Sequence, residues 1–412
     1  MITTINNEHK KLNFSSEREQ SQTCLNSAEH EKNQGRKVLN VPNLRFKEFQ
    51  GEWEKKSLGE IGESFIGLTY KPTDVVSEGG LIVFRSSNIQ NGCMDYKDIV
   101  RVNKNVKEKL ITKKDDLLVC ARNGSARLIG KNAILHEIDA NQTFGAFMMV
   151  FRSDINHFVH QLLNTRRYSS QVSENLGARI NQITSSDLSS FEFFFPKGNS
   201  EMNKIAALLD LLDERIATQN KIIDKLLSLI KGISSKIFAS IKGVEYRMGD
   251  IATITNGNSN VQDAITEAKD GLYPFFDRSE DIKYLPTFLF DKEAIIYPGE
   301  GADFMPRYFK GKFALHQRCY AIFDFNEIIN AQFLYFYLRT KNSYFIRNAV
   351  GSTVPSLRLD TFQKLKVVIP SKNTQHSVSL CLSCIEQKCY LENEILQTLL
   401  KQKQFLLRQM FI

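Results

Sequence analysis

Polar and basic side chains that could contact the bases and phosphates of a nucleic acid follow short apolar segments in both halves of this chain. In the first half they lie in "FRSSNIQNG", "CARNGSARLIGK" and "GARINQIT", and in the second half in "FFDRSED", "MPRYFKGK", "HQRC" and "VPSLRLD". Arginine can donate two hydrogen bonds to a guanine edge, asparagine and glutamine can pair with adenine, and lysine and serine can hold phosphates. The candidate contact residues are Arg85, Ser87, Asn88, Arg122, Asn123, Ser125, Arg127, Arg179, Asn181, Gln182, Arg278, Ser279, Arg307, Lys310, Gln317, Arg318, Ser356 and Arg358.

Each of these residues also has a plainer interpretation, because most polar side chains in loops contact only water. Their recurrence at corresponding places in the two halves is what favours a recognition surface over solvated loops.

Catalytic signatures do not accompany these loops. The sequence contains no glycine-rich phosphate loop, no GxSxG elbow, no HExxH motif and no Asn-Pro-Pro or Asp-Pro-Pro motif followed by an aromatic residue. His157 and His160 form an HxxH on a predicted helix, where surface or core histidines are more common than ligands. The acidic segments "EGADF" (Glu300–Phe304) and "TEAKD" (Thr266–Asp270) lack a partner carboxylate on a predicted strand. We therefore predict no catalytic residue, no metal and no cofactor.

The composition is that of a globular protein. The chain has 412 residues, 42% of them hydrophobic and 24% charged, and a formal net charge of +8 that permits a polyanionic partner without selecting one. Neither a membrane span of about 20 apolar residues nor an apolar N-terminal segment is found, which predicts a cytoplasmic protein that does not enter a membrane. Cys381, Cys384 and Cys389 fall on a helical pattern and are interpreted as small core residues, because no second cysteine or histidine pair completes a zinc site.

The sequence contains an internal repeat. "SLGEIGESFIG" (Ser57–Gly67) is echoed by "RMGDIATITNG" (Arg247–Gly257), "DDLLVCARNG" (Asp115–Gly124) by "KEAIIYPGEG" (Lys292–Gly301), and "GARINQITSSDLSSFEFFFP" (Gly177–Pro196) by "GSTVPSLRLDTFQKLKVVIP" (Gly351–Pro370). The order is kept while the offset shrinks from 190 to 177 and then 174 residues. Such a pattern indicates tandem duplicates, the second of which has lost loop residues.

Each copy ends in a segment whose apolar residues follow alternating steps of four and three, which predicts a long helix with a heptad seam. Two such seams in one chain can bury each other. Polar Gln219, Glu392 and Lys403 fall within the seams and either fix the register or lie at the surface. The principal seam residues are Ile205, Leu209, Leu212, Ile216, Ile223, Leu226, Ile230, Val378, Leu382, Ile385, Leu396, Leu399 and Leu406.

These patterns predict an α+β protein with two tandem mixed α/β domains and two long helices, related by an internal pseudo-two-fold repeat. Short segments rich in Ile, Val, Phe and Tyr predict strands between irregular loops. The first buried anchors are expected at Trp53, Leu58 and Ile61. The expected parts are a flexible arm at 1–40, a first domain at 41–196, a central helix at 197–242, a second domain at 243–370 and a C-terminal helix at 371–412.

The order of domain, helix "EMNKIAALLDLLDERIATQNKII", domain and helix resembles the specificity subunits of type I restriction-modification enzymes. The opening "VPNLRFKEFQGEWEKKSLGEI" and the segment "INQITSSDLSSFEFFFP" are also similar to that family, and the resemblance covers about Val41 to Ile412. It implies that each domain is a target recognition domain for half of a bipartite double-stranded DNA site. It also implies an antiparallel coiled coil, two docked methyltransferase (modification) subunits that act on adenine, and restriction/translocase subunits.

Two other interpretations remain open at this point. One is a stand-alone nuclease or methyltransferase, which requires catalytic motifs that the sequence lacks. The other is a helical scaffold that binds RNA or protein, for which the same basic and polar loops would serve. The second helix, "QHSVSLCLSCIEQKCYLENEIL", departs from the first and leaves the symmetry of docking open.

Overall fold

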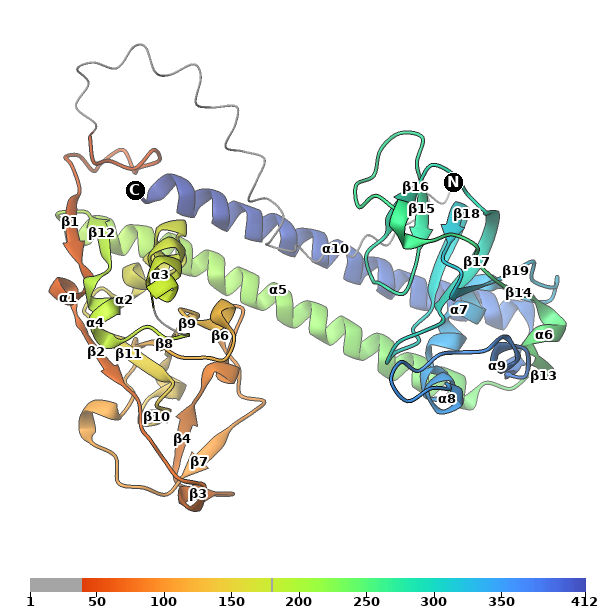
Figure 1. The fold of residues 1–412 in the computed structure, drawn as a ribbon, viewed down its shortest axis with the longest axis horizontal. Coiled ribbons are helices and arrows are strands. Elements are labelled where there is room, and N and C mark those ends of the chain that lie inside the picture. The colour runs from red at the N-terminus through yellow and green to blue at the C-terminus, as the bar shows by residue number, and fades with distance from the viewer. Residues whose placement is uncertain (1–38, 179–180) are drawn as a thin grey trace, which may run out of the picture. The chain divides into compact units, whose positions relative to one another are not determined.

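The computed structural model describes residues 39–178 and 181–412, which fall into two compact units. The N-terminal unit contains residues 39–221 and 395–412, and the C-terminal unit contains residues 222–394. Both long helices, α5 (Asn199–Ser240) and α10 (Lys372–Met410), contribute one part to each unit. The elements are labelled in Figure 1. The predicted N-terminal arm, except residues 39 and 40, and candidate Arg179 lie outside the described residues.

In the N-terminal unit, short strands form two four-stranded sheets and smaller pairs. One sheet has the order β2 (Glu63–Ile66), β11 (Met148–Arg152), β8 (Leu117–Cys120), β9 (Asn132–Ile134). The other has the order β10 (Thr143–Phe144), β4 (Leu81–Phe84), β7 (Val100–Val102), β3 (Val75–Val76). The pairs are β1 (Glu54–Ser57) with β12 (Glu192–Phe195) and β5 (Ile89–Gln90) with β6 (Cys93–Met94). The helices are α1 (Leu58–Ile61), α2 (Asn156–Leu162), α3 (Arg166–Ala178) and α4 (Ser185–Ser190).

In the C-terminal unit, the corresponding strands join into one six-stranded sheet. Its order is β14 (Thr253–Asn256), β19 (Cys319–Phe323), β17 (Phe290–Pro298), β18 (Arg307–Leu315), β15 (Tyr273–Phe276), β16 (Lys283–Leu285). Strand β13 (Val244–Arg247) pairs with β20 (Lys366–Ile369). The helices are α6 (Met248–Ile251), α7 (Ala331–Arg339), α8 (Asn342–Asn348) and α9 (Leu359–Gln363). Single 3-10 turns across both units lie at Pro72–Asp74, Ser86–Asn88, Glu108–Leu110, Ala126–Leu128, Glu137–Asp139 and Val261–Asp263.

The predicted duplication is confirmed by equivalent pairings in the two units. The unit β1-α1-β2 recurs as β13-α6-β14, and the antiparallel order β2-β11-β8 recurs as β14-β19-β17. Gly67 and Gly257, which end the duplicated segments, allow the same close approach of backbone to backbone. A Cβ on Gly67 would lie 2.3 Å from the carbonyl oxygen of Gly145, and one on Gly257 would lie 1.9 Å from that of Leu315. Only glycine fits at these places.

Each unit has its own hydrophobic core, which includes residues of both long helices. In the N-terminal unit, Ile205 and Leu209 of α5 share a core with Leu407 and Met410 of α10. Trp53 and Leu58 are buried there, as expected, and Ile61 is partly buried against the same core.

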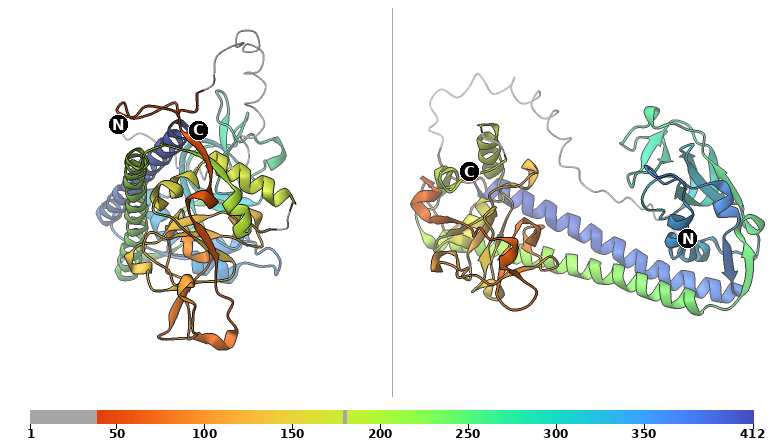
Figure 2. Two further views of the ribbon diagram at one scale, coloured as in Figure 1. Left: turned by 90° about the vertical axis from the view of Figure 1, so that its left-hand side faces the viewer. Right: turned by 60° about the horizontal axis from the view of Figure 1, so that its bottom comes forward.

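In the C-terminal unit, Phe238 of α5 and Leu382 of α10 share a core with Phe333. The start of one long helix therefore lies beside the end of the other in each unit, so the helices run antiparallel (Figures 1 and 2).

The heptad positions of both helices are inside or partly inside the molecule. Each seam residue named from the sequence is buried or half-buried, including polar Gln219, Glu392 and Lys403. The expectation for the cysteines was wrong in part: Cys389 is buried, but Cys381 and Cys384 are exposed because they lie beside the seam position Leu382 and Ile385 rather than on it. Within the described residues, no helix has both the length and the apolar character to cross a membrane.

Candidate nucleic-acid interface

Three loops that are distant in sequence meet in the N-terminal unit. Asn123 Nδ2 donates a hydrogen bond to Ser86 Oγ at 3.1 Å, and Asn181 Nδ2 donates one to the carbonyl oxygen of Gly124 at 3.3 Å. Arg122 and Gln182 form an isolated antiparallel bridge. We call residues 85–88, 122–127 and 181–182 the N-terminal loop cluster. It gathers most of the candidates named from the first half of the sequence.

Several cluster side chains are open to solvent. Arg122, Ser125 and Arg127 are exposed, while Ser87, Asn181 and Gln182 are half-buried. The Arg122 guanidinium lies 5.6 Å from the centre of the Phe147 ring, a cation–π contact. Phe147 comes from the turn between β10 and β11 and is 59% exposed. An isolated phenylalanine in "NQTFGAFMMV" carries no sequence signal for such a role, and sequence reasoning missed it.

The prediction that Asn88 contacts nucleic acid is not supported by its position. Asn88 is buried, and its Nδ2 donates to the carbonyl oxygens of Asp95 and Asp98 at 3.0 and 2.9 Å. Its Oδ1 accepts from the Arg85 amide at 2.8 Å, so the side chain shapes the loop from inside. Arg85 itself is half-buried and ion-paired with Asp98 at 2.7 Å.

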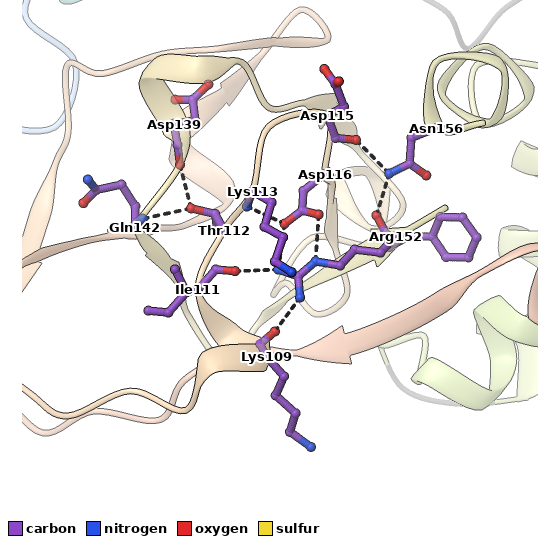
Figure 3. A network of polar contacts seen from close by, with 11 residues as sticks. Lys109, Ile111, Thr112, Lys113, Asp115, Asp116, Asp139, Gln142, Arg152 and Asn156 are labelled. Carbon is purple, nitrogen blue, oxygen red and sulfur yellow. Dashed lines mark hydrogen bonds and ion pairs between the residues drawn. The ribbon is translucent and has the colours of Figure 1, made fainter. Parts of the chain in front are cut away.

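A partly buried polar network fixes the segment that leads into β8, and Arg122 lies two residues beyond the other end of this strand (Figure 3). Arg152 contacts both carboxylate oxygens of Asp116 at 2.8 Å and also donates to the carbonyl oxygens of Lys109 and Ile111 at 3.0 and 2.5 Å. A bidentate, charge-assisted contact of this kind restricts both partners. The strand thus enters the sheet in a defined register, which sets where its exit loop lies.

The corresponding loops of the C-terminal unit line a polar pocket of about 510 Å³. Four candidates named from the sequence are among its lining residues. We call it the C-terminal pocket; it is lined by Val261, Asp277, Arg278, Ser279, Lys283, Glu300, His316, Gln317, Arg318 and Cys319.

Charges of both signs face this pocket. Asp277 accepts hydrogen bonds from Lys283 Nζ at 2.6 Å and from Ser279 Oγ at 2.5 Å. Burial, the largest influence, would raise the pKa of Asp277, but these hydrogen bonds together lower it below its ordinary value. Burial lowers the pKa of His316. Asp277 therefore stays anionic at neutral pH, and His316 stays neutral.

The remaining candidates of the second half lie apart from the pocket lining. The prediction that Arg307 contacts nucleic acid is not supported by its position. Its Nη2 donates to the carbonyl oxygen of Ser279, and burial lowers the pKa of its guanidinium, which is turned inward. Lys310 is exposed in the middle of β18 opposite Glu293, and Arg358 is exposed at the start of α9. Ser356 is half-buried.

Away from the loop cluster, polar side chains join α2 to both long helices within the N-terminal unit. Gln161 Nε2 donates to Asp210 Oδ1 at 2.9 Å and to Asp213 Oδ2 at 3.0 Å. Lys403 Nζ donates to Asp213 Oδ1 at 2.5 Å, and His157 Nδ1 lies 2.5 Å from Asp210 Oδ2. We call this group the polar seat; it consists of His157, His160, Gln161, Asp210, Asp213 and Lys403.

His160 has the neighbours that a metal ligand would need, because a nitrogen of its ring lies within 4.8 Å of carboxylate oxygens of Asp210 and Asp213. Its ring is buried, and among the described residues neither ring nitrogen has a hydrogen-bond partner. Burial and the charge of Lys403 lower its pKa to about 4. All four oxygens of the two aspartates, however, already accept hydrogen bonds from protein donors. The two aspartates are thus used to link the helices, and we assign no metal to the polar seat.

Comparisons of this chain with known proteins find similarity to one family. Residues 50–228 and 242–401 match the family model of the type I restriction modification DNA specificity domain. The specificity subunit of the type I restriction enzyme EcoDI from Escherichia coli is 30% identical over 132 residues, which are 32% of this chain and 29% of that protein. The EcoKI specificity subunit from Escherichia coli strain K12 is 28% identical over 173 residues, covering 40% and 37% of the two chains. The matched part thus spans less than half the length of these relatives.

A solved structure supports the fold. The crystal structure of the type I restriction-modification S subunit from M. genitalium is similar to this chain with a TM-score of 0.64 at 18% identity. The similarity covers 90% of this chain and 99% of that one.

Proposed function

This chain belongs to the type I restriction modification DNA specificity domain family, and we propose that it reads a bipartite double-stranded DNA site for a type I restriction-modification complex. The observation that carries the proposal is the duplication: two units of equivalent strand order each gather polar and cationic loops at corresponding positions. A bipartite site is the natural target of two such domains, because each domain can read one half. Its role is recognition, without a catalytic residue, metal or cofactor of its own.

We propose a smaller contact set than the sequence alone suggests. It consists of Arg122, Asn123, Ser125, Arg127, Asn181 and Gln182 in the N-terminal unit and Arg278, Ser279, Gln317 and Arg318 in the C-terminal unit. Arg85, Ser87, Lys310, Ser356 and Arg358 are peripheral members that could hold phosphates or support the loops. Cationic contacts to phosphates release counterions, so binding should weaken by about 0.9 log unit per contact for each tenfold rise in salt.

We propose that the two long helices carry docking faces for two methyltransferase subunits, with restriction/translocase subunits completing the complex. Large apolar side chains are exposed on both helices at positions outside the seam, among them Leu211, Leu227, Leu229, Leu391 and Phe405. Such residues are costly to leave in water along a whole helix and are typical of a surface that a partner covers. We retain the boundaries 41–196, 197–242, 243–370 and 371–412 for the domains and helices, and a cytoplasmic location follows from a DNA partner.

The decisive experiment maps adenine methylation across the host genome with and without the gene. We expect a bipartite motif that disappears on deletion and returns on complementation. Replacing residues 41–196 with the first domain of another family member should change one half of that motif only. A methylation pattern that is indifferent to the gene, or binding of RNA in preference to duplex DNA by the assembled complex, would overturn the proposal in favour of a scaffold. Methylation or cleavage by the purified chain alone would instead favour a stand-alone enzyme.

A further inference from the structure

The loop after β8 in the N-terminal unit and the loop after β17 in the C-terminal unit occupy the same place in the fold. Arg122 forms an isolated antiparallel bridge with Gln182, and Glu300 forms the equivalent bridge with Ser356. Glu300 therefore stands where the first domain has Arg122. Sequence reasoning had considered Glu300 only as part of a nuclease motif.

The neighbouring turn is also equivalent in the two units, and its chemistry is changed as well. Phe147 follows two residues after Gly145, which bridges to Leu68, and Arg318 follows two residues after His316, which bridges to Ser259. The first domain thus places a cation on the loop and an aromatic ring on the turn. The second domain places a carboxylate on the loop and the cation on the turn.

Glu300 holds Arg318 without burying it. Arg318 Nη1 donates to Glu300 Oε1 at 2.6 Å, the Glu300 side chain is only 19% exposed, and the Arg318 side chain is 62% exposed. An arginine has five N–H donors in a planar fork, and this contact uses one amino group. The mostly buried Glu300 carboxylate thus restricts the Arg318 side chain, while the Arg318 guanidinium remains accessible beside the C-terminal pocket. Because the side chain is already restricted, a second, bidentate contact has a lower entropy cost.

We propose that Arg318 reads a guanine in the half-site of the C-terminal domain and that Glu300 is its positioning residue. The inference rests on the proposed function and adds to it the base and the pair of side chains that select it. Guanine presents two acceptors, O6 and N7, side by side in the major groove, which match the two donors of the arginine fork. Adenine presents a donor at one of these places, and cytosine offers a donor instead of the acceptor pair, so both are disfavoured.

The test uses the complete chain assembled with its methyltransferase partners and maps the methylated motif by long-read sequencing. Loss of a bidentate contact is worth about 1–3 kcal/mol, so Arg318→Ala should reduce the preference for one guanine by roughly 5- to 150-fold and leave the other half-site intact. Arg318→Lys should relax the same position, because one ammonium cannot replace the fork. Glu300→Gln should reduce the guanine preference at this position by less than Arg318→Ala does. The double variant of Glu300→Gln with Arg318→Ala should show the same preference as Arg318→Ala alone.

Lys364→Ala is the matched control, because Lys364 is an exposed cation directly after α9 in the same unit, paired with Asp360 and not among the pocket residues. It should leave the motif unchanged. The inference is overturned if folded Arg318→Ala complex keeps the full motif, or if the relaxed position is not a guanine; the proposed function survives either result. If the wild-type complex neither binds nor methylates a bipartite site, the proposed function fails, and this inference fails with it.

Discussion

Helices α2 and α7 are counterparts that the two units use in different ways. Each follows the strand β11 or β19 and lies against the long helix that ends its own copy of the repeat. Thr165 and Thr340 make the same side-chain hydrogen bond at the ends of the two helices, to the carbonyl oxygens of Leu162 and Tyr337, and this alignment places His160 and Gln161 of α2 opposite Tyr335 and Phe336 of α7. Both helices pack aromatic rings into the core of their unit, with Phe158 of α2 against Trp53 and Phe411, but α2 adds the hydrogen-bonded polar seat where α7 extends its aromatic cluster.

In the C-terminal unit, the ring of Phe238 from α5 lies 5.6 Å from Phe333 and 5.3 Å from Tyr337, both of α7. One ion pair, Arg339 to Glu386 at 2.7 Å, adds a polar link to α10. The loops diverge in the same manner, with Arg122 and Phe147 in one unit and Glu300 and Arg318 in the other. Duplication thus kept the backbone pairings and the glycines that permit them, while the side chains at equivalent places changed in chemistry.

The strongest test of this comparison is Phe238→Ala in the aromatic cluster. Removing a buried phenylalanine leaves a cavity, and we expect the free energy of unfolding of the C-terminal unit to fall by about 3–5 kcal/mol. Hydrogen exchange in α7 reports on this unit, while the fluorescence of Trp53, the single tryptophan of the chain, reports on the N-terminal unit. Phe405→Ala, at a residue that is 55% exposed, is the control and should stay within about 0.5 kcal/mol of wild type. Unchanged exchange in α7 would show that the cluster does not hold it.

Lys403→Met tests the polar seat in the other unit. It leaves the Asp213 carboxylate partly buried with fewer donors, so the unit that contains Trp53 should lose about 1–3 kcal/mol of stability. The double variant Asp213→Met with Lys403→Met should recover much of this loss, because an apolar pair of similar volume can replace an ion pair. Lys401→Met, at an exposed position of α10, controls for the lost charge. A double variant that is less stable than the single one would show that Asp213 matters for more than its pair with Lys403.

The repeat could be predicted from the sequence because its chemistry is local. Segments such as Ser57–Gly67 and Arg247–Gly257 combine strand-forming residues with glycines at fixed places, and their equivalence is visible without coordinates. The heptad steps likewise identify which residues of each long helix turn inward. That Asn123 meets Ser86, and Glu300 meets Arg318, depends on loop paths that no local pattern encodes.

The candidate site was harder to predict because residue type does not specify direction. Asn88 and Arg307 have the chemistry of base readers, but each uses it on backbone carbonyl groups inside its own unit. Phe147 and Glu300 were missed for the opposite reason. Neither has a type that signals nucleic-acid recognition until its position beside an arginine is known.

The pH dependence of stability distinguishes the polar seat of α2 from the aromatic cluster of α7. Folded His160 has a pKa of about 4 against an ordinary value of 6.5, so between these values the unfolded chain binds the extra proton. Stability therefore falls as the pH drops through this range, by about 2 kcal/mol between pH 7 and pH 5 from this residue. Its neighbours Lys403, Asp213, Asp210 and His157 are the charged and titratable groups that face it.

His160→Leu, which replaces the imidazole with an apolar side chain, should remove this part of the acid-side loss in Trp53-monitored unfolding. His157→Asn is the control with the opposite sign. The hydrogen bond to Asp210 raises the pKa of His157, so its contribution is complete below pH 6.5 and is lost as the pH rises through the raised value. Equal acid sensitivity of wild type and His160→Leu would contradict a buried, unprotonated imidazole.

The smallest expected effect concerns the loop that Arg122 shares with Phe147. A cation–π contact at an exposed site is worth about 0.5–1 kcal/mol, so Phe147→Ala should weaken DNA binding by the assembled complex roughly two- to fivefold. It should act on the half-site opposite to the one that Arg318→Ala relaxes, since the two residues lie in different units. Ile138→Ala, at a residue that is 76% exposed in the same unit, is the matched control. Arg122→Ala should weaken DNA binding more than Phe147→Ala does, because it removes the hydrogen-bond donors themselves. If the ring only supports the guanidinium, the double variant should bind DNA as Arg122→Ala does. The ring contacts DNA on its own if Phe147→Ala weakens DNA binding as much as Arg122→Ala does, or if the double variant binds DNA more weakly than Arg122→Ala alone. In that case the two domains differ in the side chains that they present to the bases as well as in the position of the cation.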